Sequence, residues 1–113
     1  MYIKNTTKKI LLAKNAKVCK NIFSISVGLM FSKPKSLIFV FKKEKIIPLH
    51  MFFVFYPIDI LFLNKNKVII EIKENFKPFC FYTPKNKAKY VIEIPKGTIK
   101  KSKTKIKDKI EFQ

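Results

Sequence analysis

Residues 49–63 read LHMFFVFYPIDILFL and form the most apolar run of the chain. Together with its apolar flank, the run is long enough for a transmembrane helix. However, Asp59 would cost about 2.5–3.5 kcal/mol near the centre of a bilayer, and Pro57 would interrupt helical hydrogen bonding. Aromatic and β-branched residues fill the run, and they favour strands. We therefore expect two buried strands, Leu49–Phe55 and Ile58–Leu63, in a protein without a membrane span.

Short apolar segments between charged or proline-containing stretches make up the rest of the chain. Their spacing predicts further strands at Lys8–Lys14, Leu37–Phe41, Val68–Lys73, Tyr90–Ile94 and Lys105–Phe112. We expect a charged hairpin loop at Lys42–Lys45, a turn at Asn64–Lys67 and one helical turn at Gly97–Ser102. Closely spaced short strands are typical of a small antiparallel β-barrel or a jelly-roll-like sandwich. We predict this mainly β fold in a single domain over residues 1–113, with a frayed N-terminus over residues 1–7.

The segment from Val18 to Leu29 fits two structures. Its apolar residues recur at helical spacing, and Asn15 has the right chemistry to cap a helix that follows it. Residues Phe23–Leu29 also alternate with the period of a strand. The pattern alone leaves both structures open.

The chain is strongly basic, with a net charge of +18 over 113 residues. All 25 basic residues are lysine. Lysine attracts phosphate without reading sequence, whereas arginine contacts phosphate and guanine with two parallel hydrogen bonds. The abundant Lys, Ile, Asn, Phe and Tyr also share A/T-rich codons, so base composition explains much of the charge. The charge therefore predicts non-specific binding at most.

Lysines alternate with other residues along the C-terminal segment. On an extended segment they would share one face, formed by Lys101, Lys103, Lys105, Lys107 and Lys109. A charged edge of this kind normally keeps strands of different molecules apart. Alternatively, it would bind RNA or another polyanion, with bases stacking on Phe76, Phe79, Phe81 and Tyr82.

Metal and nucleophile chemistry has little support in the sequence. Cys19 and Cys80 are far apart, which indicates two small buried hydrophobic residues in a reducing cytosol rather than a disulfide framework or a metal site. His50 is the only histidine and has no neighbouring ligand. Two glycines cannot build a phosphate-binding loop. We expect no metal and no cofactor.

Three acids lie on predicted strands: Asp59, Glu71 and Glu93. Two of them would meet if their strands were adjacent, and paired carboxylates would suit a hydrolase. Asp59 lies in the most apolar part of the chain, where an unpaired carboxylate is costly. We expect backbone N–H groups or a lysine to bind it, which makes Asp59 a structural acid.

Five segments together resemble a known family. In chain order they are Gly28–Phe31, Leu37–Phe41, Pro57–Phe62, Val68–Ile72 with Asn75, and Ala88–Ile94 with Gly97. Their order and spacing resemble the domain-of-unknown-function family one-nine-two, also called uncharacterised protein family zero-one-two-seven, in an archaeal-type form. The resemblance implies a small β-rich fold with a helix before Gly28, and it implies no known reaction.

The chain departs from the family pattern at two places. Many bacterial members have Trp-Met-Lys-Asn-Thr where this chain has His50 to Val54, so any polar site built by Lys-Asn-Thr is absent here. The family commonly has Gly-Asp where this chain has Lys107-Asp108. A turn that needs a positive φ would be strained at Lys107. Bacterial relatives also carry signal sequences, whereas Met1–Asn15 lacks the apolar core of one.

Our leading hypothesis is a cytoplasmic, monomeric, non-enzymatic module that binds a small ligand or a protein. The alternatives are a non-specific RNA- or polyanion-binding protein and a hydrolase-like enzyme with paired acids. The candidate binding residues are His50, Asp59, Phe79, Phe81, Tyr82 and Glu93.

Overall fold

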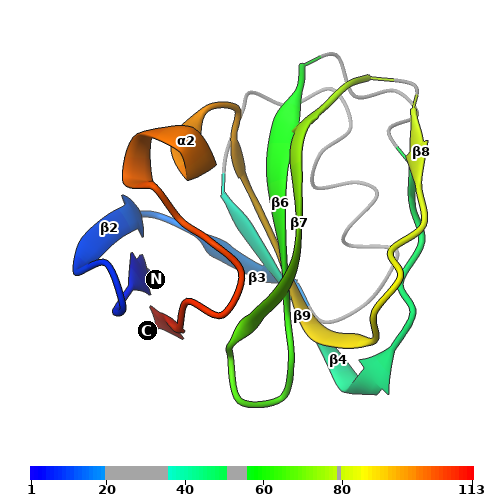
Figure 1. Ribbon diagram of the computed structural model, residues 1–113, viewed down its shortest axis with the longest axis horizontal. Helices are drawn as coiled ribbons and strands as arrows, with labels where there is room; N and C mark the ends of the chain where they lie inside the picture. The colour runs from blue at the N-terminus through cyan, green and yellow to red at the C-terminus, as the bar shows by residue number, and fades with distance from the viewer. Residues whose placement is uncertain (20–35, 51–55, 79) are drawn as a thin grey trace.

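The computed structural model describes residues 1–19, 36–50, 56–78 and 80–113 (Figure 1). These residues form three β-sheets and one short helix, α2 (Thr98–Ser102). The central sheet has the order β3 (Lys17–Cys19), β4 (Leu37–Lys45), β9 (Ala88–Pro95), β6 (Ile58–Leu63) and β7 (Ile69–Phe76). The second sheet has the order β10 (Ile110–Phe112), β1 (Ile3–Asn5) and β2 (Ile10–Ala13). A ribbon of β5 (Leu49–His50) and β8 (Phe81–Tyr82) is the third.

Strand β6 is the centre of the molecule, because it pairs with β9 on one side and β7 on the other and all six of its residues are buried. Successive side chains of a strand point to opposite faces of a sheet. Ile60 and Phe62 therefore pack on one face with Leu37, Phe39 and Val91. The confirmed strand Ile58–Leu63 is thus buried on both sides.

The two faces of the central sheet are covered by different elements. On the Phe62 face lies the β5–β8 ribbon, whose Tyr82 ring lies 5.9 Å from the ring of Phe62 and 6.3 Å from that of Phe76. On the opposite face Leu61 and Ile92 pack with Ile3 of β1 and Ile99 of α2. Figure 1 shows the termini, β2 and α2 on one side of the central sheet and β8 on the other. The fold is a layered stack of β-sheets.

Strand β7 contains a bulge beside Phe62, where the pairing shifts from Leu63–Ile69 to Phe62–Glu71. The extra residue, Ile70, moves Glu71 to the face opposite Ile69. A regular alternation along the predicted strand Val68–Lys73 would place Glu71 on the same face as Ile69, and the bulge breaks this alternation. Because of the bulge, the Glu71 carboxylate reaches the Phe62 face.

The mainly β fold, the turn at Asn64–Lys67 and the helical turn after Gly97 are confirmed. The predicted barrel is wrong for the described strands, since the central sheet starts at β3 and ends at β7 without closing. The arrangement is also not wholly antiparallel, because β3 and β4 run parallel. In the part of the chain that is described, no helix is long and apolar enough to cross a membrane.

The predicted frayed N-terminus is wrong. Strand β1 lies between β2 and β10, and Asn5 is completely buried. The Asn5 side-chain nitrogen donates hydrogen bonds to Thr104 Oγ1 at 3.0 Å and to Asp108 Oδ2 at 2.9 Å. A buried polar residue with partners about a hundred positions away gives no apolar pattern, so the sequence did not reveal this strand.

The expected helix does not begin at Val18. Val18 and Cys19 belong to β3, which pairs with β4, and Asn15 precedes that strand rather than capping a helix. The remainder of the Val18–Leu29 helix prediction lies outside the described residues. So do Gly28–Phe31 and most of the predicted strand Leu49–Phe55.

Three further expectations fail. Lys42–Lys45 continues β4 instead of forming a loop. The C-terminal strand predicted at Lys105–Phe112 is limited to Ile110–Phe112, and Ile106 lies outside it and is 53% exposed. Cys80 is exposed rather than buried. The charge of Lys42–Lys45 indicated a loop, but the pairing of Lys45 with Ala88 of β9 keeps this segment in a strand.

Candidate functional site

Glu93 is a buried acid whose Oε2 atom has no hydrogen-bond partner among the described residues. It lies in β9 opposite Leu37 of β4 and Ile60 of β6, and therefore on the same face of the central sheet as Phe62. Burial raises the pKa of Glu93 to about 8, because removal from water disfavours the charged form. Near neutral pH the side chain is mostly a neutral carboxylic acid.

Glu71 and Tyr82 form a second polar group on this face. The Tyr82 hydroxyl donates a hydrogen bond to Glu71, which also accepts from the backbone nitrogens of Lys85 at 3.0 Å and Asn86 at 3.1 Å. Burial acts to raise the pKa of Glu71, but the hydrogen bonds from Tyr82, Asn86 and Lys85 outweigh it and leave this pKa lowered. Burial and the hydrogen bond to Glu71 raise the pKa of Tyr82 to about 12. Glu71 therefore holds β8 and the following turn against the central sheet.

Asp59 has the backbone partners predicted for it. Its Oδ1 accepts from Asn75 N at 2.9 Å, and its Oδ2 accepts from Gly97 N at 3.0 Å and Ile99 N at 3.1 Å. Three N–H groups from β7 and from the start of α2 thus converge on one buried carboxylate. This arrangement supports the structural role expected for Asp59.

The three acids do not form a shared catalytic site. Asp59 lies on the opposite face of β6 from Ile60, the residue paired with Glu93. Glu71 faces the same side as Glu93, but its carboxylate is occupied by Tyr82 and by the turn at Lys85 and Asn86. No hydrogen bond among the described residues joins any two of these acids. Paired-acid chemistry consequently has no geometric support in the described residues.

The aromatic loop contributes only part of its predicted site. Main-chain pairing places His50 opposite Phe81, and Leu49 opposite Tyr82. Phe81 is 70% exposed, whereas Tyr82 is half-buried against the central sheet. Phe79 and the side chain of His50 lie outside the described part of the structure. Phe81 and Tyr82 therefore point to different environments rather than forming one stacking surface.

The C-terminal lysines do not lie on one extended strand. Lys101 belongs to α2, Lys103 ends that helix with a left-handed φ of 57°, and Lys107 lies in a turn with a φ of 81°. Lys105 and Lys109 flank this turn, and all five lysines are exposed. The segment is therefore not the single extended strand on which the predicted stripe was based, because a helix and a turn interrupt it.

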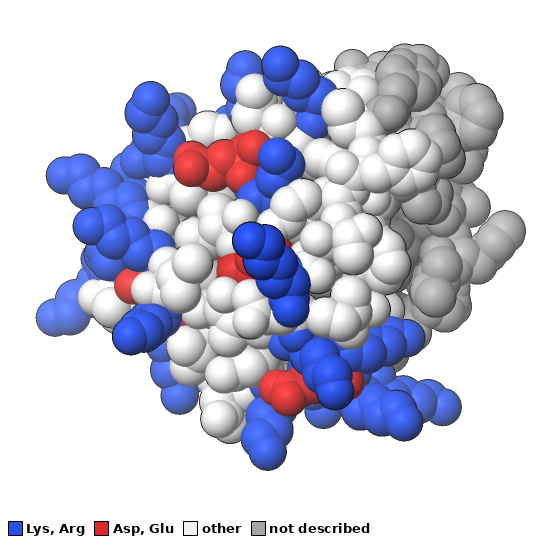
Figure 2. Space-filling model, turned by 45° about the vertical axis from the view of Figure 1, so that its right-hand side comes forward, with Lys and Arg blue, Asp and Glu red and all other residues white. Residues whose placement is uncertain are grey.

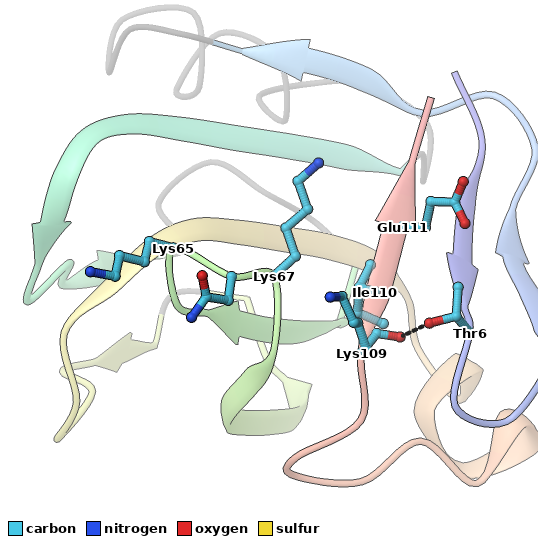
Figure 3. A pocket seen from close by; sticks show the side chains of 7 residues that line it. Thr6, Lys65, Lys67, Lys109, Ile110 and Glu111 are labelled. Atoms are coloured by element: carbon cyan, nitrogen blue, oxygen red, sulfur yellow. Dashed lines mark hydrogen bonds between the residues drawn. The ribbon is translucent and has the colours of Figure 1, made fainter.

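Lysine is the commonest lining residue in two surface pockets of the described chain. The turn pocket, of about 470 Å³, lies between the Asn64–Lys67 turn and β10, and its charged residues are Lys65, Lys67, Lys109 and Glu111 (Figure 3). The helix pocket, of about 540 Å³, lies beside α2, and its charged residues are Lys8, Lys100, Lys103, Lys105 and Glu74. Sequence analysis placed Lys103, Lys105 and Lys109 in a stripe and missed the pockets, because they join residues from distant segments.

Comparison with known proteins assigns the chain to a family. The sequence profile of DUF192, described as "Uncharacterized ACR", matches residues 3–112. The chain belongs to this family. A UPF0127 protein of Pyrococcus furiosus is 36% identical over 111 residues, which cover 96% of this chain and 95% of the relative. A UPF0127 protein of Pyrococcus horikoshii is 32% identical over 113 residues, 97% of each chain.

Two solved structures share the fold of this DUF192 chain. A proposed transcription regulator from Sinorhizobium meliloti superposes with a TM-score of 0.85 over 97% of this chain and 89% of its own, at 20% identity. A protein of unknown function from Novosphingobium aromaticivorans gives 0.84 over 98% and 82%, also at 20% identity. The described DUF192 residues hold no group of three or more His, Cys, Asp or Glu side chains that would bind a metal.

Proposed function

We propose that this DUF192 protein is a non-enzymatic binding module whose ligand is anionic, built on a jelly-roll-like scaffold and acting as a monomer in the cytoplasm. The observation that carries the proposal is the lysine lining of the turn pocket and the helix pocket. Within the described residues, Lys8 with Asp108 is the single ion pair, at 3.1 Å. The other pocket lysines keep their charge available for a ligand.

The contacts of Asp59 and Glu71 support binding rather than paired-acid catalysis. A general acid or base must lie within hydrogen-bond reach of the group it serves. Asp59 and Glu71 use their oxygens for backbone and tyrosine donors, and both hold structural elements together. The pocket lysines lie at the surface instead, where all but the half-buried Lys67 are exposed to an incoming anion.

The experiment is a titration of the protein with pyrophosphate, with arginine and a neutral disaccharide as controls. We expect isothermal titration calorimetry to detect pyrophosphate binding that weakens as salt is raised, because exposed charges are screened within about 8–10 Å at 0.1–0.15 M salt. Equal heats for pyrophosphate and for the neutral sugar would refute an anionic ligand.

RNA is a second candidate, favoured by the distribution of lysine over the surface. Figure 2 shows lysine side chains around much of the described face, with few carboxylates among them. If RNA is the ligand, two unrelated oligonucleotides of equal length should bind equally and lose affinity in parallel as salt rises. Fluorescence anisotropy at several salt concentrations measures this, and a strong preference for one sequence at raised salt would contradict it.

A further inference from the structure

The turn pocket joins two sheets that are distant in the sequence. The two sheets meet here because Val68 and Lys109 make an isolated antiparallel bridge and Ile110 N donates to Lys67 O at 2.9 Å. Figure 3 shows Lys65 and Lys67 extending from the turn, and Lys109 extending from the start of β10. The volume of about 470 Å³ lies within the range of small-ligand sites.

Lys67 is held in place by its backbone and by two aromatic rings. The backbone nitrogen of Lys67 donates a hydrogen bond to Asn64 O at 2.9 Å, and its φ of 62° lies in the left-handed region. Its ammonium lies 4.3 Å from the centre of the Phe112 ring and 5.9 Å from that of Tyr90. The face of an aromatic ring attracts the charge of an ammonium group. It is, however, a weaker hydrogen-bond acceptor for the N–H groups than an oxygen atom is. The donors of Lys67 thus remain available to a ligand oxygen.

Lys109 is fixed through its main chain. Its carbonyl accepts from Thr6 N at 2.9 Å and from Thr6 Oγ1 at 3.1 Å, and its nitrogen donates to Thr7 Oγ1 at 2.9 Å. The backbone position from which this side chain leaves is therefore defined, while the side chain itself is exposed. Lys67 and Lys109 flank the pocket from two sheets.

The one acid of the turn pocket does not neutralise these lysines. Glu111 Oε1 accepts a hydrogen bond from Gln113 Nε2 at 3.0 Å, and in the described structure it makes no ion pair with Lys65, Lys67 or Lys109. Three ammonium groups and one carboxylate leave the pocket with an excess of positive charge. In the helix pocket, by contrast, Lys8 already pairs with Asp108.

We propose that the turn pocket binds a phosphate group through the ammonium groups of Lys67 and Lys109. This inference rests on the proposed anionic ligand and names its chemistry and its site. Lysine binds phosphate as a point charge, whereas a planar carboxylate is matched better by the arginine fork that this chain lacks. The phosphate belongs either to a small free phosphate compound or to an RNA backbone.

The test compares two double variants of equal charge. Lys67→Gln with Lys109→Gln removes the proposed ligands, and Lys42→Gln with Lys43→Gln removes two exposed lysines of β4 that line neither pocket. Each lowers the net charge from +18 to 18 − 2 = +16. We expect the first to weaken pyrophosphate binding about tenfold or more, from the loss of two close charge contacts, and the second about twofold or less. Far-ultraviolet circular dichroism and urea unfolding check that both variants are folded.

A second experiment measures the binding of a single-stranded RNA oligonucleotide to the same variants. Selective weakening of RNA alone assigns the phosphate to a nucleic-acid backbone, and selective weakening of pyrophosphate assigns it to a small compound. A Lys67→Arg, Lys109→Arg variant should restore binding, because it restores both charges. Equal weakening by the two double variants overturns the site but leaves an anion-binding module standing. Absence of any binding by the unmodified protein overturns the site and the proposed function together.

Discussion

Glu93 places a carboxyl group inside a hydrophobic sheet face, and its raised pKa makes stability depend on pH. In the unfolded chain the group ionises near its ordinary value of 4.5, but in the folded protein it keeps its proton up to about 8. The folded state therefore binds more protons across this window. The contribution of Glu93 to the free energy of unfolding is fully present below pH 4.5 and is lost as pH rises to about 8, by on the order of 1 kcal/mol per pH unit.

The Glu93→Gln variant should lack this fall, because an amide does not ionise. Urea unfolding of both proteins between pH 4.5 and pH 8 measures the difference. Among the described side chains on the same face, the pKa of Glu71 is lowered and that of Tyr82 is raised to about 12, so neither titrates between pH 4.5 and pH 8. Parallel pH profiles for the two proteins would show that Glu93 is solvated or paired when folded.

Asp59 differs from Glu93, because both of its buried carboxylate oxygens accept hydrogen bonds. In Asp59→Asn, the amide NH₂ group must face either Asn75 N–H or the N–H groups of Gly97 and Ile99. We expect a loss of about 1–3 kcal/mol in the free energy of unfolding at neutral pH. The control is Glu74→Gln, the same chemical change on an exposed side chain, which should change stability by about 0.5 kcal/mol or less. Equal stability of Asp59→Asn and the unmodified protein would refute the structural role.

At the scale of elements, the turn before β10 is strained at Lys107. Asp108 N donates to Lys105 O at 3.1 Å, and the φ of Lys107 is 81°. A turn of this kind prefers glycine at its third position. A side chain in this conformation destabilises the folded protein by about 1–2 kcal/mol. Glycine removes this strain, but it loses more chain entropy on folding, which offsets about 0.5–1 kcal/mol of the gain.

Lys107→Gly should therefore raise the free energy of unfolding by about 0.5–1 kcal/mol, as the difference of those two terms. Thermal or urea unfolding gives the value. The matched control is Lys105→Gly in the same turn. The φ of Lys105 is not positive, so glycine relieves no strain there and should destabilise the protein. If both substitutions destabilise equally, the turn is not strained at Lys107.

The same scale shows how far the sequence predicts this fold. Strands β6 and β9 were recognised because each is a continuous apolar run with its own boundaries, and Lys107 was recognised as a strained position from one missing glycine. Strand β1 was missed because its buried residue is the polar Asn5, whose partners lie at the other end of the chain. The bulge at Ile70 was missed because a two-residue period carries no sign of an inserted residue.

At the scale of the whole molecule, the candidate site was the least predictable feature. The turn pocket is made by lysines of the β6–β7 turn and of β10, and no local motif connects them. In a chain with 25 lysines, charge alone does not distinguish these from the others. Only the pairing of Val68 with Lys109 brings them to one place.

The position of β1 between β2 and β10 sets an order of events during synthesis. Asn5 and its partner Asp108 are separated by 103 residues, and a ribosome adds about 5–20 residues per second. The N-terminal hairpin must therefore wait on the order of 5–20 s before the strand that completes its sheet exists. Throughout that interval one edge of β1 and the polar side chain of Asn5 are open to chaperones, proteases and other nascent chains.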